Sequence, residues 1–210
     1  METWTYWIGW AGTVAFVVTG VLAVAPKGID LFSASVMGVI TAVGGGTIRD
    51  IILEVPIFWS IDQSYIWVSI AVSVITFYAS NTFSRKEINK TMLILDAAGI
   101  SLFGIQAVEK VWGLGFALPI APIMLGVLTA IGGGLTRDVL AGRQNLLMSR
   151  TIYAIPVLLG CTLYVLILEF LPEYKIEGAI ASVVVIFGIR LTAIIKNLTV
   201  PDWLYLKTSK

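Results

Sequence analysis

Hydrophobic residues occur along the chain in long blocks, separated by short stretches that hold proline, glycine, asparagine or charged residues. A helix needs about 20 apolar residues to cross roughly 30 Å of hydrocarbon at 1.5 Å per residue. The blocks predict seven membrane-spanning helices at about residues 5–25, 31–53, 65–82, 92–111, 118–141, 151–171 and 176–196. We therefore expect an all-α polytopic membrane protein.

The composition supports this class and narrows the chemistry. Hydrophobic residues make up 58% of the chain and charged residues 13%, whereas soluble domains contain about 45–50% and about 25%. Histidine is absent and Cys161 is the single cysteine, so disulfides and thiolate or imidazole metal sites have no basis. Without a nucleophile–base pair or a carboxylate cluster, we expect no enzyme. Neither a cofactor nor a nucleic-acid partner is expected.

The distribution of lysine and arginine predicts the orientation in the membrane, because cytoplasmic loops are enriched in these residues. With seven spans, one side holds nine of them and the other side two, namely Lys110 and Lys175. We therefore expect the N-terminus outside and the C-terminus in the cytosol. The nine are Lys27, Arg85, Lys86, Lys90, Arg143, Arg150, Lys196, Lys207 and Lys210.

The chain contains an internal repeat. The segment from Gly38 to Asp50 returns as the segment from Gly126 to Asp138 at a constant offset of 88, which Tyr65 and Tyr153 also keep. Three predicted spans separate the two copies, so the second copy crosses the membrane in the opposite direction. This predicts two inverted three-helix repeats, residues 1–91 and 92–175, followed by a seventh helix and cytosolic tail, residues 176–210.

Each copy carries three adjacent glycines near the middle of a predicted span. Glycine costs about 1 kcal/mol against alanine in a helix, and inverted repeats place solute pathways at discontinuous helices near the midplane. One interpretation is that the second and fifth helices break there and expose carbonyl groups to the pathway. The other is close packing of helices through small residues. The glycines are Gly44, Gly45, Gly46, Gly132, Gly133 and Gly134.

An arginine–aspartate pair follows each glycine triplet, as Arg49–Asp50 and Arg137–Asp138. The pairs lie roughly 10 Å beyond the span centres at 1.5 Å per residue, where an unpaired charge costs a few kcal/mol. Adjacent helix positions point about 100° apart, so we expect partners on other helices or an aqueous pathway. The pairs then either form charged collars at opposite mouths of a pathway or lock the halves together by interhelical salt bridges.

A polar stripe runs down the fourth predicted helix. Asp96, Gly99, Phe103, Gln106 and Lys110 follow each other at steps of 3, 4, 3 and 4, which places them on one helix face. The first helix has the less polar equivalents, since the stripe there consists of Gly9, Gly12, Phe16, Thr19 and Ala23. This asymmetry predicts a pathway with one polar wall.

Several polar residues remain open to two interpretations. Asp96 is expected to pair with Lys90 or with an arginine of the fifth helix, and Lys110 either lines the pathway or extends to the interface. Glu109 is expected to face a loop, and Arg190 to act as an interfacial anchor. Hydroxyl groups that line the pathway or bond within their own helix are those of Thr13, Thr41, Ser69 and Thr129.

The doubled Gly-Gly-Gly-x-x-Arg-Asp motif, together with Asp96-Ala97-Ala98-Gly99, resembles the prokaryotic trimeric intracellular cation (TRIC) channels over about residues 5–196. This broad family includes bacterial proteins with a "glycine transporter" domain. The resemblance implies a homotrimer in a prokaryotic plasma membrane. Each subunit would hold a pore beside the kinked second and fifth helices, permeable mainly to K⁺ and secondarily to Na⁺, with membrane lipid bound. It places Arg49, Asp50, Arg137 and Asp138 beside the pore.

The chain departs from this family at two positions. Glu109-Lys110-Val111 stands where animal members have Lys-Glu-Val, so the roles tied to that element are not carried over. Gly9 stands where many relatives have an aspartate like Asp96, so a symmetric site is not implied. The residues also allow an alternating-access carrier of a small zwitterion such as glycine, with helix N-termini holding the carboxylate. The family resemblance favours the channel.

Overall fold

The computed structural model describes residues 3–80, 82 and 84–200. Eight α-helices lie in these ranges: α1 (Thr3–Val24), α2 (Leu31–Ile52), α3 (Phe58–Ile61), α4 (Ser64–Ser80), α5 (Arg85–Gly113), α6 (Ile120–Leu140), α7 (Ala154–Phe170) and α8 (Lys175–Ile195). Three short 3₁₀ helices, η1 (Ala25–Lys27), η2 (Leu146–Met148) and η3 (Pro172–Tyr174), lie in the connections. The part of the chain described here has no β-strand. The predicted cytosolic tail from residue 201 lies outside it.

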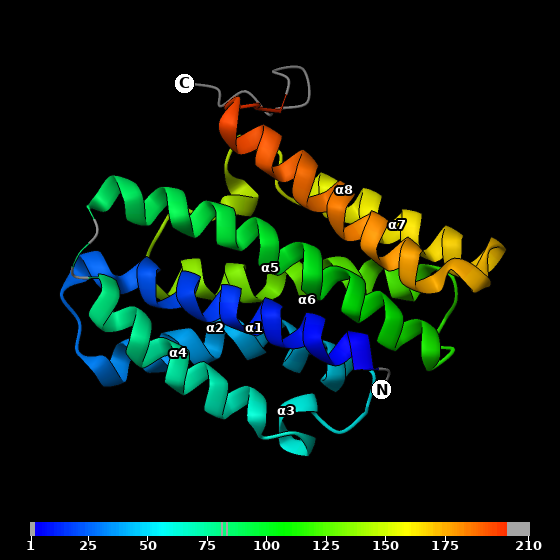
Figure 1. Ribbon diagram of the computed structural model, residues 1–210, viewed down its shortest axis with the longest axis horizontal. Helices are drawn as coiled ribbons and strands as arrows, with labels where there is room; N and C mark the ends of the chain where they lie inside the picture. The colour runs from blue at the N-terminus through cyan, green and yellow to red at the C-terminus, as the bar shows by residue number, and fades with distance from the viewer. Residues whose placement is uncertain (1–2, 81, 83, 201–210) are drawn as a thin grey trace, which may run out of the picture.

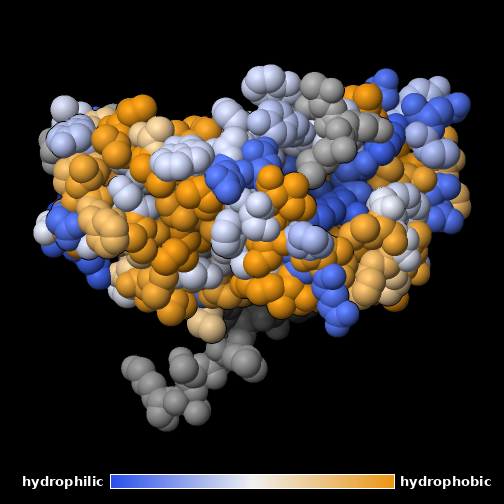
Figure 2. All heavy atoms as spheres, turned by 90° about the horizontal axis from the view of Figure 1, so that it is seen from below, coloured by the Kyte–Doolittle hydropathy of each residue, from blue (hydrophilic) through white to orange (hydrophobic). Residues whose placement is uncertain are grey.

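Five of the helices, α1, α2, α5, α6 and α8, are long and apolar enough to cross a membrane. The helices α4 and α7 are apolar too, with 17 residues each. Many large hydrophobic side chains are exposed, among them Phe32, Trp67 and Ile75, and Figure 2 shows a face on which hydrophobic residues predominate. The prediction of an all-helical membrane protein is therefore confirmed.

The long helices lie side by side along the longest dimension of the molecule (Figure 1). Within the first half, α1, α2 and α4 pack against one another, and α5, α6 and α7 do the same in the second half. The halves meet where α1 packs on α5 and α2 packs on α6, while α8 packs on α5 and α7. Figure 1 shows that α1 begins at the end of the bundle opposite to that at which α8 ends.

The contact between α1 and α5 is built from equivalent residues of the two stripes. The rings of Phe16 and Phe103 lie 5.3 Å apart. Each ring also covers a glycine of the other helix, since a Cβ on Gly99 would lie 2.7 Å from Phe16 and one on Gly12 would lie 3.4 Å from Phe103. The shared stripe therefore serves as the contact surface that joins the halves.

The glycine triplets form the contact between α2 and α6. A Cβ on Gly45 would collide with the carbonyl oxygen of Thr129, and one on Gly133 would collide with that of Thr41. Both helices continue through their glycines, so the predicted break is wrong and the packing interpretation holds. The reason is that close contact between backbones offsets the poor helix propensity of glycine, while each helix keeps its internal hydrogen bonds in lipid.

The bounds of the seven long helices lie within three residues of the predicted spans, except at the start of α5. Helix α5 begins at Arg85 rather than at about 92, because Ser84 and Glu87 form a reciprocal capping box. Arg85, Lys86 and Lys90, which were predicted to lie in a loop, therefore belong to the first turns of α5. The short elements α3 and η2 were not predicted.

Helix α2 also begins with a cap. Asp30 accepts hydrogen bonds from the backbone nitrogen of Ser33 at 3.0 Å and from its hydroxyl at 2.8 Å. These bonds stabilise the ionised form, so the pKa of Asp30 lies below its usual value.

Candidate functional site

The first charged cluster consists of Arg49 and Asp50 near the end of α2 and Lys110 near the end of α5. Arg49 Nε donates to Asp50 Oδ1 at 2.8 Å, and Lys110 Nζ donates to the same oxygen at 2.7 Å. The other oxygen, Asp50 Oδ2, accepts from the backbone nitrogen of Phe58 at 2.9 Å. The side chain of Asp50 is fully buried, whereas that of Lys110 is 23% exposed. Two cations therefore share one carboxylate.

The second charged cluster consists of Arg137 and Asp138 near the end of α6, Asp96 of α5 and Thr19 of α1. Arg137 Nε donates to Asp138 Oδ1, and Arg137 Nη1 donates to Asp96 Oδ1 and to Thr19 Oγ1, all at 2.9 Å. The side chains of Arg137 and Asp96 are fully buried. Here one guanidinium is held by two carboxylates. Two partners were expected for Asp96, Lys90 or an arginine of the fifth predicted span. The observed partner is that arginine, Arg137 of α6.

The two clusters repeat the same local structure. Asp138 Oδ2 accepts from the backbone nitrogen of Leu146 at 3.2 Å, which corresponds to Phe58 at the offset of 88. The backbone turn after each helix also agrees, with φ of 54° at Glu54 and 55° at Gly142. The aspartate of each pair thus fixes the connection that carries α3 in one half and η2 in the other.

The contacts within each pair correct the expectation that an arginine cannot neutralise the aspartate next to it. The two side chains leave the helix in different directions, but the long arginine side chain curves back so that its Nε reaches the carboxylate of the next residue. Arg137 and Asp50 also bind residues of other helices, Asp96 and Lys110 respectively, so interhelical salt bridges are observed. The charged collars at the mouths of a pathway stay a prediction.

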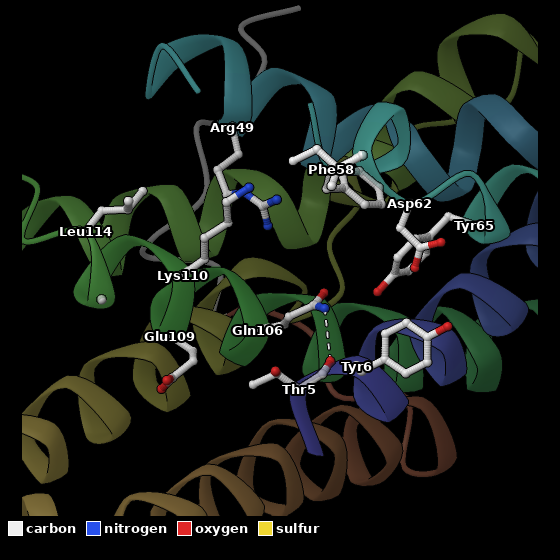
Figure 3. A pocket seen from close by; sticks show the side chains of 12 residues that line it. Thr5, Tyr6, Arg49, Phe58, Asp62, Tyr65, Gln106, Glu109, Lys110 and Leu114 are labelled. Atoms are coloured by element: carbon white, nitrogen blue, oxygen red, sulfur yellow. Dashed lines mark hydrogen bonds between the residues drawn. The ribbon is translucent and has the colours of Figure 1, made fainter. Parts of the chain in front are cut away.

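A cavity of about 690 Å³ lies beside the first charged cluster, between α1, α2, α3, α4 and α5. Figure 3 shows Arg49 and Lys110 on one side and Asp62 and Tyr65 on the other, with Gln106 between them. Gln106 Nε2 donates to the carbonyl oxygen of Thr5 at 3.1 Å. Of the residues predicted for the pathway, Arg49, Gln106 and Lys110 line this cavity. A smaller hollow of about 290 Å³ lies beside Asp138 and Arg143.

The four hydroxyl groups predicted for the pathway all bond within their own helices. Each donates to the carbonyl oxygen four residues earlier, at 2.6 to 2.8 Å. None of them lines either of the two cavities described above. They are Thr13, Thr41, Ser69 and Thr129.

Two further charged residues lie in places that were not predicted. Glu109 does not face a loop: it accepts a hydrogen bond from the hydroxyl of Tyr164 at 2.6 Å and pairs with Lys175 at 2.5 Å. Arg190 is not an interfacial anchor, because it is buried, donates to the carbonyl oxygen of Ile152 at 2.8 Å and lies 4.8 Å above the ring of Tyr153. Glu109 was assigned to a loop because it is offset from the polar stripe of its helix, and Arg190 to the interface because it lies near the end of its span.

Sequence reasoning also missed residues of the cavity. Asp62 was not singled out, and Thr5 and Tyr6 lie only at the start of a predicted span, yet all three line the cavity. Phe58 and Leu146 are related by the offset of 88, which is a signal in the sequence. In the structure, the backbone nitrogen of Phe58 donates to Asp50, and that of Leu146 donates to Asp138. Nothing in the sequence marks Asp62 as facing Arg49, because that depends on how α3 folds back.

The glycine transporter family model matches residues 6–81 and 93–169 of this chain. The UPF0126 inner membrane protein YadS of Escherichia coli K12 is 34% identical over 200 residues, which are 94% of this chain and 95% of YadS. The TRIC channel orthologue from Rhodobacter sphaeroides is 33% identical, with a TM-score of 0.88, over 94% of this chain and 100% of that one. The chain belongs to the TRIC family.

Two further comparisons agree with this membership. A prokaryotic TRIC channel solved in 0.5 M KCl has a TM-score of 0.87 at 27% identity, over 95% of this chain and 100% of that one. The UPF0126 membrane protein YvgT of Bacillus subtilis is 33% identical over 149 residues, which are 71% of this chain and 73% of YvgT. The predicted resemblance to the TRIC channels is therefore confirmed. As a member of this family, the present chain is an integral membrane protein.

Proposed function

We propose that this protein is a cation-selective channel, permeable mainly to K⁺, with an ion pathway inside each subunit. The observation that carries the proposal is the match of nearly the whole chain, at 33% identity, to the R. sphaeroides cation channel. The cavity beside the first charged cluster supports it, since the charged and polar side chains of Arg49, Gln106 and Lys110 reach a mainly apolar hollow among the helices. Arg49, Asp50 and Lys110 form one collar of the pathway.

The pathway continues from this cavity past the contact between α2 and α6 towards the second charged cluster. Arg137 and Asp96 are fully buried there, so the pathway is closed at this end in the conformation described. Opening requires the contact between Arg137 and Asp96 to loosen, or α6 to move relative to α5. The glycines at the crossing allow such movement because no side chain interlocks the two backbones there.

Seven membrane spans in two inverted repeats are part of the proposal, with the N-terminus outside. The equivalent packing within each half and the equivalent turns after α2 and α6 support the inverted repeat. The first charged cluster then lies towards the outside and the second towards the cytosol. We also propose a homotrimer with lipid between subunits, because the R. sphaeroides relative is a trimeric channel and many large hydrophobic side chains are exposed on the single subunit.

Flux measurements in liposomes separate this function from a carrier. Vesicles containing the purified protein should release K⁺ at a rate that rises without saturation over a wide concentration range. A carrier would instead show saturable uptake of radiolabelled glycine with little K⁺ flux. Protein-free vesicles provide the control, and glycine uptake without K⁺ flux would overturn the proposal.

A further inference from the structure

We propose that the aromatic ring of Phe58 closes the inner end of the cavity beside the first charged cluster to water and cations. The ring acts as a hydrophobic gate, which opens when the connection that carries α3 moves away from α2. This inference rests on the proposed function, because it describes how the outer half of the proposed pathway is closed.

The ring of Phe58 lies directly on the first glycine triplet. A Cβ on Gly46 would lie 2.6 Å from Cε1 of Phe58, which is shorter than a van der Waals contact, so the ring fills the space beside this glycine. Phe58 also lines the cavity. Figure 3 shows it between Arg49, whose guanidinium carbon is 5.8 Å from the ring centre, and Tyr65, whose ring centre is 5.0 Å away. The ring is therefore the part of the cavity wall that covers the glycines of α2.

The helix face behind the ring is apolar and buried. Ala42 lies one turn before Gly46 on the same face of α2 and is 3% exposed. It belongs, with Phe16 and Val17, to the hydrophobic core against which Phe58 packs. Ions cross a narrow passage with apolar walls only when it widens enough to hold water. A ring at the entrance of this apolar stretch is thus a barrier to ions even though it carries no charge.

Two hydrogen bonds to α2 hold the gate in its closed position. The backbone nitrogen of Phe58 donates to Asp50 Oδ2 at 2.9 Å, and Nε1 of Trp59 donates to Thr47 Oγ1 at 2.9 Å. The other oxygen of Asp50 binds Lys110. The aspartate therefore links the position of the ring to the charged groups at the cavity, so a change in these contacts can release the connection.

The second half is closed by different groups at the equivalent position. A Cβ on Gly134, the counterpart of Gly46, would lie 2.9 Å from the hydroxyl of Tyr153, 3.2 Å from Asp96 Oδ1 and 3.5 Å from Arg137 Nη2. The three atoms nearest to a Cβ on Gly46 all belong to the aromatic ring instead. The two halves of the repeat thus differ in the chemistry of closure, with a buried ion pair in one and an apolar ring in the other.

The reactivity of a buried thiol tests the gate without requiring conduction. Ala42→Cys, in a chain whose Cys161 is replaced by serine, places a thiol behind the ring, and the small cationic reagent 2-aminoethyl methanethiosulfonate probes it. We expect Phe58→Ala to raise the rate constant of this reaction at least about tenfold, and Phe58→Leu to raise it less. The matched control is Phe77→Ala, which removes a half-buried ring near the other end of α4 that lines neither cavity. Equal rate constants with phenylalanine and with alanine at position 58 would overturn the inference.

Flux of K⁺ from liposomes measures the effect on conduction. Phe58→Ala should raise the flux at least about threefold, whereas Phe77→Ala should leave it unchanged. The backbone nitrogen of residue 58 can still donate to Asp50 in both variants of this position, so the connection is expected to stay in place. Wild-type flux that neither Phe58→Ala nor Phe58→Leu alters would overturn the gate and leave the channel intact. Absence of flux in every sample, with the difference in thiol reactivity retained, would support the closure and contradict only the proposed function.

Discussion

Asp96 is the residue on which the charge balance of the second cluster depends. Its carboxylate and that of Asp138 together hold Arg137, and all three side chains are almost completely buried. In the first cluster, Lys110 contacts Asp50 from a position that is 23% exposed, and Arg49 remains beside Asp50 if the lysine is removed. A buried pair loses much more stability than a partly hydrated one when one partner is removed.

The first prediction follows from this difference. Asp96→Asn should lower the free energy of unfolding by about 3 kcal/mol, because Arg137 stays buried with one carboxylate fewer. Lys110→Met should lower it by less than about 1 kcal/mol. Reversible unfolding in mixed micelles, followed by circular dichroism, measures both changes. Equal losses in the two variants would contradict the burial argument.

The second prediction concerns the arginines of the two collars. Arg49→Ala and Arg137→Ala should each change K⁺ flux or gating, because both side chains occupy the proposed pathway and each holds an aspartate that fixes a connection. Liposome flux measures the change, and gel filtration checks assembly. Folded, trimeric variants with wild-type flux would refute a role of these arginines in conduction.

Individual residues could be predicted from the sequence where a charged side chain stands inside an apolar block, because burying a charge in a membrane costs free energy. Charges such as Arg137 and Asp138 inside an apolar block had to be paired or hydrated, so they could be singled out. The partner of Asp96 was narrowed to two choices. Asp62 could not be found, because its place depends on the fold of a connection between two helices.

At the scale of helices, the contact between α2 and α6 depends on individual glycines in different ways. A Cβ on Gly45 or Gly133 would meet a backbone carbonyl oxygen of the facing helix, which cannot move aside. The nearest atom to a Cβ on Gly44 is 3.9 Å away, which is an ordinary contact distance. The three glycines therefore form a matched set for mutation.

The third prediction is that Gly45→Ala and Gly133→Ala lower the unfolding temperature, while Gly44→Ala leaves it unchanged or raises it. Alanine favours a helix over glycine by about 1 kcal/mol, and only Gly44→Ala gains this without a clash. Thermal unfolding in detergent measures the three variants. If Gly44→Ala were as harmful as Gly45→Ala, the triplet would act as a hinge rather than as a packing surface.

The sequence was informative about helices and misleading about their glycines. Apolar blocks located the long helices because membrane thickness sets their length. Helix propensity alone suggested a break at Gly44 to Gly46, but packing against α6 overrides it. The early start of α5 was missed because Arg85, Lys86 and Lys90 ended the apolar block, although Ser84 and Glu87 have the spacing of a capping box.

At the scale of the whole molecule, the orientation in the membrane decides which cluster faces outside. The fourth prediction is that a cysteine at Ser60, in the connection after α2, reacts with a membrane-impermeant maleimide on intact cells. A cysteine at Arg85, at the start of α5, should react only after permeabilisation. Both positions are exposed, and Cys161 is replaced by serine in the background because it is the single native cysteine. Labelling of both positions from the same side would contradict the seven-span topology.

The central claim is that K⁺ passes through a pathway inside each subunit. Current measurements in planar bilayers test this claim most directly. Purified protein should give unitary currents in asymmetric KCl whose reversal potential lies near the equilibrium potential of K⁺. The Lys110→Met variant is expected to fold, because it should lose less than about 1 kcal/mol of stability. It should also conduct K⁺, and it removes one positive charge beside the proposed pathway. Currents that reverse near the Cl⁻ potential, or a silent bilayer with protein shown to be inserted, would contradict the account.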